Sequence, residues 1–380
     1  MNARIYILTF LCLLLTAGAF LTAQTEDGND YATALQENFS PDGPGAAAIV
    51  IKDDKILYHG AVGMASVELG VEMRSDNVFR IGSITKQFTS AAILKLAEEG
   101  KLSLEDEITK FLPEYPTQGK TITVHHLLNH TSGIKSYTGL QKWDGEARKR
   151  DFTPQEMVDY FKDEPMDFAP GEEFRYNNSG YFLLGYIVEI ASGKTYEEYV
   201  EETFFAPLGM EQSRYGNPLE IVPGRVEGYA PGEGGFSNAE YLSMTQPYGA
   251  GSLLSTVEDL STWYHALVAG KVISEESLEK ALTPTKLNNG ETEAYGYGWS
   301  LGDLKGSRRF GHNGGINGFV STSLFLPDEK VFVAVLSNCT CNDPSGAANK
   351  MAEIAIDKYE PIVAIDVKAE QLAAYVGKFE

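Results

Sequence analysis

The chain contains few cysteines and few basic residues for its size. Among 380 residues there are three cysteines, and 31 lysines and arginines stand against 53 aspartates and glutamates. So few cysteines cannot form a disulfide framework, and the fold must therefore depend on a hydrophobic core. A formal net charge of −22 leaves no basic footprint for nucleic acid and should keep the protein in solution, away from anionic membrane surfaces.

Long apolar runs are also scarce, and the one that stands out is at the N-terminus. Arg4 precedes an apolar run over Ile5–Leu15, and small residues follow up to Ala23. The run is short compared with the roughly 20 residues that span a bilayer. We therefore expect a secretory signal peptide at 1–23, cleaved before Gln24, with an uncleaved membrane anchor as the alternative. The mature protein would be secreted or periplasmic, without stable membrane insertion.

Two cysteines remain after the signal peptide, Cys339 and Cys341. A single residue between them makes a mutual disulfide strained and uncommon. No further pair of ligands for a metal stands near them. We expect two ordinary cysteines at the end of a strand.

Two widespread hydrolase signatures are missing. No serine has glycine both two residues before and two residues after it, so an α/β-hydrolase nucleophile elbow is excluded. No H-E-x-x-H motif is present either. His126 and His130 are four residues apart and are the remaining zinc candidates, but His130 opens a turn, which favours structural roles for both.

A serine three residues before a lysine occurs three times, beginning at Ser83, Ser132 and Ser277. Ser132 lies in a turn, and Ser277 lies in a charged helical stretch that is typical of a solvated face. Ser83 alone has a glycine before it and a long apolar helix after it. In such a helix Lys86 would lie one turn beyond Ser83 on the same face and could act as its base. The N–H groups at the helix start favour a developing oxyanion.

Strands are expected at both ends of the chain and helices between them. Asp53 and Asp54 would join two strands in a hairpin, and Pro327–Lys330 would join two others. The region 211–250 is expected to be irregular and to border a site. Expected strands cover 46–52, 55–62, 297–301, 308–311, 319–326 and 331–336. Expected helices cover 84–99, 104–112, 124–129, 154–162, 181–191, 346–359 and a stretch from a capping box at Ser255 to Ala269. The pattern predicts a mixed α/β fold, with one antiparallel sheet built from both chain ends and a helical lobe.

Two further elements carry chemistry. In Tyr176-Asn177-Asn178, a tyrosine beside a cation can have a lowered pKa and shuttle a proton. Asn178 can both donate to and accept from a substrate amide. His312-Asn313-Gly314 is expected between two strands, where glycine permits a ligand to approach the backbone closely.

Ser83-x-x-Lys86, Tyr176-x-Asn178 and His312-x-Gly314, in this order, resemble the serine β-lactamase-related family. That family includes class C β-lactamases, D-Ala-D-Ala carboxypeptidases, D-aminopeptidases and related esterases. The resemblance implies a β-lactamase-like three-layer sandwich with a helical lobe. It also implies a serine hydrolase domain over 24–358, followed by a C-terminal extension at 359–380 that resembles the start of a small β-barrel domain.

The resemblance also implies roles for single residues. Ser83 would be the acylated nucleophile and Lys86 its activating partner. Tyr176 would pass the proton to the leaving group and later help water attack, and Asn178 would hold the substrate amide. The N–H groups of Ser83 and Gly315 would form the oxyanion hole. Whether Lys86 or Tyr176 is the general base stays open, and no metal or organic cofactor is implied.

One departure from the family pattern concerns the substrate. Class C β-lactamases carry Lys-Thr-Gly where this chain has His312, Asn313 and Gly314, the expected substrate-binding residues. A histidine is mostly neutral at pH 7, so the exchange puts efficient β-lactam hydrolysis in doubt. If His312 contacts a substrate carboxylate, its charge should matter.

We therefore expect a secreted hydrolase that acts through an acyl-enzyme on an amide or ester of a small molecule or short peptide. Candidate substrates are a D-Ala-type peptide, a D-amino-acid amide, a small ester and a β-lactam. The alternative is a catalytically silent secreted binding protein with the same pocket. The oligomeric state is left open.

Overall fold

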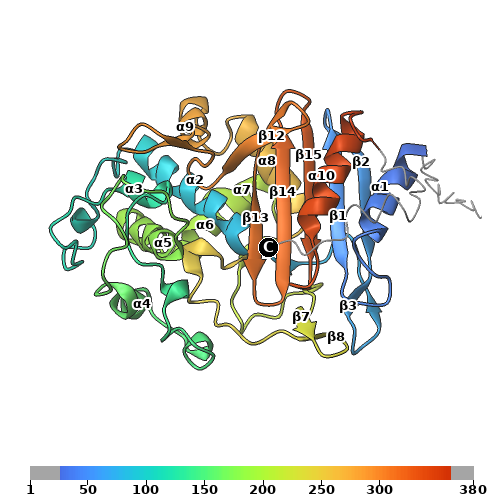
Figure 1. Cartoon of the computed structure of the whole chain (residues 1–380), viewed down its shortest axis with the longest axis horizontal. Helices are drawn as coiled ribbons and strands as arrows, with labels where there is room; N and C mark the ends of the chain where they lie inside the picture. Colours follow the sequence, from blue (N-terminus) through green and yellow to red (C-terminus); the bar gives the residue numbers. More distant parts are fainter. Residues whose placement is uncertain (1–25, 361–380) are drawn as a thin grey trace, which may run out of the picture.

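The computed structural model describes residues 26–360 and shows a sheet half and a helical half (Figure 1). Within these residues the largest sheet has six antiparallel strands in the order β12-β13-β14-β15-β1-β2. β1 from the N-terminal end pairs along its whole length with β15 from the C-terminal end. The expected sheet from both chain ends is thus confirmed. Its strands are β1 (Ala46–Lys52), β2 (Lys55–Val62), β12 (Ser300–Leu304), β13 (Ser307–Ile316), β14 (Phe319–Leu326) and β15 (Val331–Ser337).

Both faces of this sheet are covered, which makes three layers. Alternate residues of β1 point to opposite faces, as the two-residue period of a strand requires. Ala48 and Val50 pack with α1 (Glu26–Gln36) and α10 (Pro344–Ala355), while Ile49 belongs to the main core of the molecule. Because β1 and β15 are buried on both faces, their sequences are nearly continuous apolar runs rather than alternating ones.

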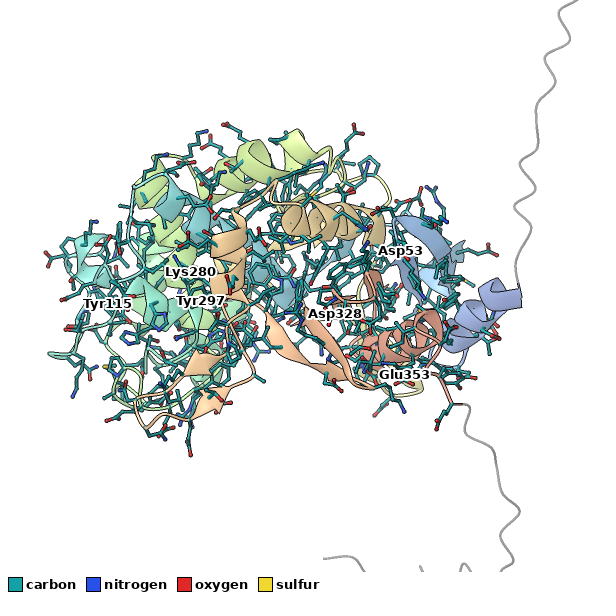
Figure 2. All side chains as sticks on the ribbon, turned by 90° about the horizontal axis from the view of Figure 1, so that it is seen from above. Asp53, Tyr115, Lys280, Tyr297, Asp328 and Glu353 are labelled. Carbon is teal, nitrogen blue, oxygen red and sulfur yellow. A yellow bond between two sulfur atoms is a disulfide. The ribbon has the colours of Figure 1, made fainter. Side chains whose placement is uncertain are left out.

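The helical half surrounds α2 (Thr85–Glu98), whose residues are almost all buried. Capping residues define where two of the other helices begin. Thr153 and Glu156 form a capping box at the start of α4, and Asn177 caps α5 by accepting from the Gly180 N–H group. The other helices of the described chain are α3 (Val124–Leu128), α4 (Pro154–Phe161), α5 (Asn178–Ser192), α6 (Tyr196–Val200), α7 (Ala206–Leu208), α8 (Val257–Val268) and α9 (Glu275–Ala281). Figure 2 places Tyr115 of this half far from Asp53 at the β1–β2 turn.

The short strands form small sheets apart from the six-stranded sheet. β5 and β6 both pair with β9, and β7 and β8 form a hairpin inside the region expected to be irregular. The short strands are β3 (Met64–Ser66), β4 (Val71–Glu72), β5 (Phe79–Arg80), β6 (Arg214–Tyr215), β7 (Tyr229–Gly232), β8 (Gly235–Asn238), β9 (Leu253–Ser255), β10 (Thr285–Lys286) and β11 (Thr292–Glu293).

Several expected boundaries are wrong. The stretch 104–112 contains a single 3₁₀ turn, Ile108–Lys110, instead of a helix. Thr256 rather than Ser255 caps α8, because its side chain accepts from the Asp259 N–H group. β13 does not end before His312 but continues to Ile316, because β14 pairs with it up to that point.

The expectation for the cysteines is also wrong, because Cys339 and Cys341 form a disulfide. The chain turns sharply after β15, where the Asn342 N–H group bonds to the Cys339 carbonyl. This turn brings the two Cα atoms to 5.1 Å, inside the range usual for disulfides. Sequence spacing alone does not reveal such a turn.

The expected signal peptide at 1–23 and most of the C-terminal extension, from residue 361 on, lie outside the described residues. Within residues 26–360, no helix has both the length and the apolar character needed to cross a membrane.

Candidate active site

Ser83 lies in the 3₁₀ turn Gly82–Ile84 that leads into α2, directly against strand β13. Glycines permit this approach. Gly82 has φ +51°, and a Cβ atom added there would lie 2.9 Å from the backbone nitrogen of Gly315. A Cβ atom on Gly314 would lie 2.0 Å from the carbonyl oxygen of Ile81. Any larger residue at these positions would push β13 away, so the glycines keep the Gly315 nitrogen beside the serine turn.

Lys86 is fully buried one turn after Ser83. Its Nζ lies 3.3 Å from Ser83 Oγ, 2.8 Å from Asn178 Oδ1 and 2.9 Å from the Ala250 carbonyl oxygen. Burial lowers the pKa of Lys86 well below its ordinary value, which favours the neutral amine. The amide and carbonyl oxygens can only accept, so they take the two N–H donors of this amine. The remaining lone pair then faces the Ser83 hydroxyl.

Tyr176 covers this pair from the outside. Lys86 Nζ lies 4.6 Å from the centre of its ring. The residue as a whole is 39% exposed, but its hydroxyl end points inward. Burial raises the pKa of Tyr176, and a hydrogen bond with Ser83 lowers it by less. The expected lowering of this pKa is therefore wrong, because loss of water outweighs the hydrogen bond with Ser83.

A chain of buried rings forms the wall next to Tyr176. His130 Nδ1 lies 3.1 Å from the Asn177 nitrogen, and His130 Nε2 lies 3.2 Å from Tyr295 Oη. Tyr295 Oη in turn lies 3.0 Å from His312 Nε2. His312 Nδ1 lies 2.5 Å from the Asn313 carbonyl oxygen.

The groups at the two ends of this row of hydrogen-bonded rings decide which atom donates in each hydrogen bond. The Asn177 N–H group can only donate and the Asn313 carbonyl can only accept. A neutral His130 therefore donates from Nε2 to Tyr295, and Tyr295 donates to His312. Burial first, and Lys86 second, lower the pKa of His312 to about 3. His312 is thus neutral near pH 7, with both ring nitrogens engaged, which leaves no cation here for a substrate carboxylate.

The sequence patterns do not identify three members of this site. Tyr295 belongs to no motif, and His130 enters only as a zinc candidate or as a structural histidine at a turn. Gly82 was noted only as the residue before Ser83. Tyr295 belongs to the site because its side chain contacts both histidines. Sequence spacing does not predict this contact.

The structure brings together Ser83, Lys86, Tyr176, Asn178, His312 and Gly315. Asn178 holds Lys86 through Oδ1, and its Nδ2 lies 3.3 Å from Thr138 Oγ1. The side chain of Asn313 takes the opposite face of β13. There it lines a hollow of about 100 Å³ together with Ser345 and Asn349 of α10.

The two other serine–lysine pairs are not coupled. Lys135 bonds to Asp167 at 2.5 Å, while Ser132 accepts from the Ile134 N–H group. Lys280 bonds to Glu276. Ser277 is buried beside the cap of α9 rather than on the solvated face that its sequence context suggested. Only Ser83 contacts the lysine three residues after it.

The zinc hypothesis finds no support in these contacts. His126 Nδ1 accepts from the Thr123 N–H group at the start of α3, and both nitrogens of His130 are engaged as described. Across residues 26–360, no group of three or more His, Cys, Asp or Glu side chains could hold a metal ion.

The chain is similar to known proteins over most of its length. The family model described as Beta-lactamase matches residues 30–358. The chain is 34% identical over 303 residues to "Penicillin-binding protein 4*" of Bacillus subtilis (strain 168), covering 74% of this chain but only 65% of that protein.

Two solved structures are similar over 88% of this chain, each with a TM-score of 0.75. One is the octameric penicillin-binding protein homologue from Pyrococcus abyssi, at 31% identity over 78% of that chain. The other is a D-stereospecific amidohydrolase from Streptomyces sp., at 27% identity over 99% of that chain. With the family model matching most of its length, this chain belongs to the beta-lactamase family.

Proposed function

We propose that the protein is a serine hydrolase that forms an acyl-enzyme at Ser83 on an amide or ester. The observation that carries this proposal is the arrangement around Lys86. Its two donors are directed at Asn178 Oδ1 and the Ala250 carbonyl, so its lone pair is free for the Ser83 proton. A lysine with a pKa lowered by burial is an effective base near neutral pH.

The first step joins Ser83 Oγ to the substrate carbonyl carbon while the Ser83 proton moves to Lys86 Nζ. The carbonyl π-electrons move onto oxygen, which accepts hydrogen bonds from the N–H groups of Ser83 and Gly315. The closeness of the Gly315 nitrogen to the serine turn supports this oxyanion hole.

Collapse of this intermediate breaks the bond to the leaving group, which takes a proton from the Tyr176 hydroxyl. Lys86 replaces that proton on Tyr176. Water then attacks the acyl-enzyme by the reverse sequence and releases the acid. The raised pKa of Tyr176 suits a group that stays protonated until the leaving group needs the proton.

The substrate would lie along β13 between His312 and Ile316. β12 pairs with β13 only up to Gly311, so beyond that residue the edge of β13 is open toward the site. His312, Asn313 and Gly314 would line the leaving group, with Asn313 contributing its backbone, and Asn178 would contact the substrate amide through its remaining donor. Similarity to a D-stereospecific amidohydrolase supports D-amino-acid amides, D-Ala-type peptides and small esters.

A β-lactam is the least favoured substrate, because neutral His312 stands where class C enzymes have lysine. We also propose secretion or a periplasmic location, from the N-terminal sequence pattern alone. The competing candidate, a silent binding protein, is disfavoured because Lys86 is already oriented toward Ser83.

A fluorophosphonate probe tests the proposal directly. Wild-type protein should be labelled once, on the peptide that contains Ser83. Ser83→Ala should lose both labelling and turnover, by several orders of magnitude, with its thermal unfolding preserved. Ser132→Ala is the matched control and should keep both.

The substrate class is tested with a panel of p-nitrophenyl esters, D-amino-acid amides, a D-Ala-D-Ala peptide and a chromogenic cephalosporin. Labelling that survives in Ser83→Ala would refute the assigned nucleophile. Unlabelled wild-type protein that turns over nothing in the panel would favour the silent binding protein.

A further inference from the structure

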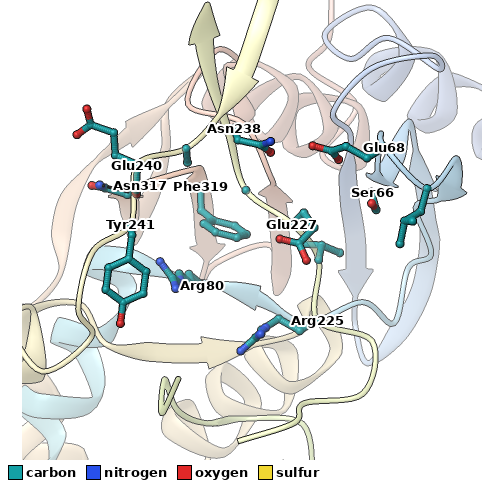
Figure 3. A pocket seen from close by; sticks show the side chains of 14 residues that line it. Ser66, Glu68, Arg80, Arg225, Glu227, Asn238, Glu240, Tyr241, Asn317 and Phe319 are labelled. Carbon is teal, nitrogen blue, oxygen red and sulfur yellow. Dashed lines mark hydrogen bonds between the residues drawn. The ribbon is translucent and has the colours of Figure 1, made fainter. Parts of the chain in front are cut away.

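A second hollow, of about 490 Å³, opens near the C-terminal end of β13, where Asn317 follows that strand (Figure 3). Arg80 of β5 and Phe319 of β14 lie at its centre, and Arg225 and Tyr241 come from the segment between β6 and β9. We call this hollow the arginine pocket. Nothing in the mechanism above uses it.

The arginines of the pocket lack partners. In a chain with 53 acidic and 31 basic residues, a guanidinium group without an ion pair is unexpected. Yet among residues 26–360, Arg80, Arg150 and Arg225 are the arginines with neither a side-chain hydrogen bond nor an ion pair. Two of these three line the same hollow.

Arg80 is held in place by packing rather than by charge. It is partly buried, and its guanidinium carbon lies 5.7 Å from the centre of the Phe319 ring. Burial, and then the charge of Arg225, lower the pKa of Arg80. Both effects mean that its positive charge is poorly compensated here.

The acidic residues around the pocket do not neutralise the positive charges of its two arginines. Glu68 accepts a hydrogen bond from Tyr229 Oη at 2.5 Å, and Glu240 forms an ion pair with Arg148 at 3.8 Å. Glu227 is the remaining carboxylate of the lining, and its charge favours protonated Arg80 only weakly, behind the effects of burial and Arg225. One weakly coupled carboxylate faces two guanidinium groups, which leaves donors free for an incoming anion.

The pocket adjoins the reacting atoms. Arg80 precedes Ser83 by three residues, so their Cα atoms are at most about 10 Å apart. Asn317, also in the lining, follows Gly315 by two residues. The rings of His312 and Tyr176 lie 6.0 Å apart at the other end of this part of β13. If Tyr176 protonates the leaving group there, the pocket lies on the acyl side.

We propose that the arginine pocket binds a carboxylate on the acyl part of the substrate, through Arg80 and Arg225. This assignment rests on the proposed hydrolase function for its orientation, and it narrows the substrates to those with an acidic acyl group. Paired guanidinium groups bind a carboxylate with strong, directional hydrogen bonds.

The kinetic test uses mono-p-nitrophenyl adipate and its methyl ester, which differ in the terminal charge. For wild-type protein, kcat/KM should be at least about tenfold higher for the free acid, and this preference should shrink with added salt. Arg80→Met and Arg225→Met should each lower the acid-to-ester ratio about tenfold, with Arg80→Lys losing less. Glu227→Gln should raise the ratio.

Arg150→Met is the matched control. It also removes an unpaired guanidinium group, but one that packs on Phe152, away from the pocket. The acid-to-ester ratio of kcat/KM for Arg150→Met should equal that of wild type. A ratio near one in wild type, or an unchanged ratio in both Arg80→Met and Arg225→Met, would overturn the proposal. Since Arg225 is exposed, its variant stays informative even if Arg80→Met fails to fold.

A binding measurement separates this proposal from the hydrolase function. Adipic acid monoanilide and its methyl ester are titrated calorimetrically into Ser83→Ala, with and without Arg225→Met. The acid should bind more tightly, and only where Arg225 is present. If phosphonate labelling fails but this preference holds, the hydrolase function is wrong and the pocket stands. If labelling succeeds and both compounds bind equally, the pocket assignment is wrong.

Discussion

The two sides of Ser83 satisfy their polar groups in opposite ways. On one side Lys86, His130, Tyr295 and His312 form a closed set, in which every donor has an acceptor within the protein. On the other side the guanidinium groups of the arginine pocket have no hydrogen-bond partner in the described chain.

The paired side is arranged for the chemical step, and the side with unpaired arginines is arranged to bind a ligand. A buried polar group without a partner costs about 1–3 kcal/mol, so the closed side must be fully paired to be stable. Pairing also fixes each proton before substrate arrives. The open side is more solvated, so it can leave strong donors free until an anion replaces water.

Lys86→Met should give the largest loss. Methionine fills a similar volume but has no lone pair for the Ser83 proton and no donor for Asn178. We expect the rate of phosphonate labelling and kcat/KM for esters to fall by about a thousandfold or more. Lys135→Met is the control, since Lys135 pairs with Asp167 instead. A loss below tenfold in Lys86→Met would mean that Tyr176 is the base.

Tyr295→Phe should lower kcat by about tenfold and leave KM less affected. The change removes the donor to His312 Nε2 and the acceptor for His130, so the wall beside Tyr176 loses its fixed hydrogen-bond directions. It should also cost about 1–3 kcal/mol of stability. Tyr297→Phe provides a matched control, because Tyr297 bonds to His125 at 2.6 Å outside this ring chain. Equal kcat values for the two variants would contradict a positioning role for Tyr295.

The neutral state of His312 predicts a pH effect on stability. Its pKa is about 3 in the folded protein, against ~6.5 in an unfolded chain. Between these values the unfolded chain binds a proton that the folded protein does not, so stability falls as pH drops from 6.5 towards 3. Relative to His312→Gln, wild type should lose about 2–3 kcal/mol between pH 6.5 and 4.5, measured by urea unfolding. Parallel curves for the two proteins would show that His312 is not held neutral.

Arg80→Met should have the smallest effect on stability, below about 1 kcal/mol, because no hydrogen bond or ion pair is lost and the aliphatic packing is kept. Urea unfolding of this variant beside Tyr295→Phe measures the contrast between the two sides directly. A larger loss for Arg80→Met would show that its charge supports the fold and is not reserved for a ligand.

Local patterns predicted the framework well. The helix that carries Lys86 and the hairpin around Asp53 follow from periodicity and turn chemistry, which depend on neighbours in the chain. The apolar strands at both ends predicted the shared sheet, which β1 and β15 confirm. Boundaries failed where a distant partner decided them, as for β13, which continues past His312 because β14 supports it.

Local sequence is enough to identify the residues that could do chemistry: a serine and a lysine one helical turn apart, with a tyrosine and a histidine in family order. Tertiary structure decided their states. Burial lowers the pKa values of Lys86 and His312 and raises that of Tyr176, and long-range packing brings Tyr295 between two histidines. The same packing closes a disulfide after β15 and leaves Arg80 and Arg225 of the arginine pocket without an ion pair. Desolvation and hydrogen-bond partners depend on residues far apart in the chain, and local sequence does not record them.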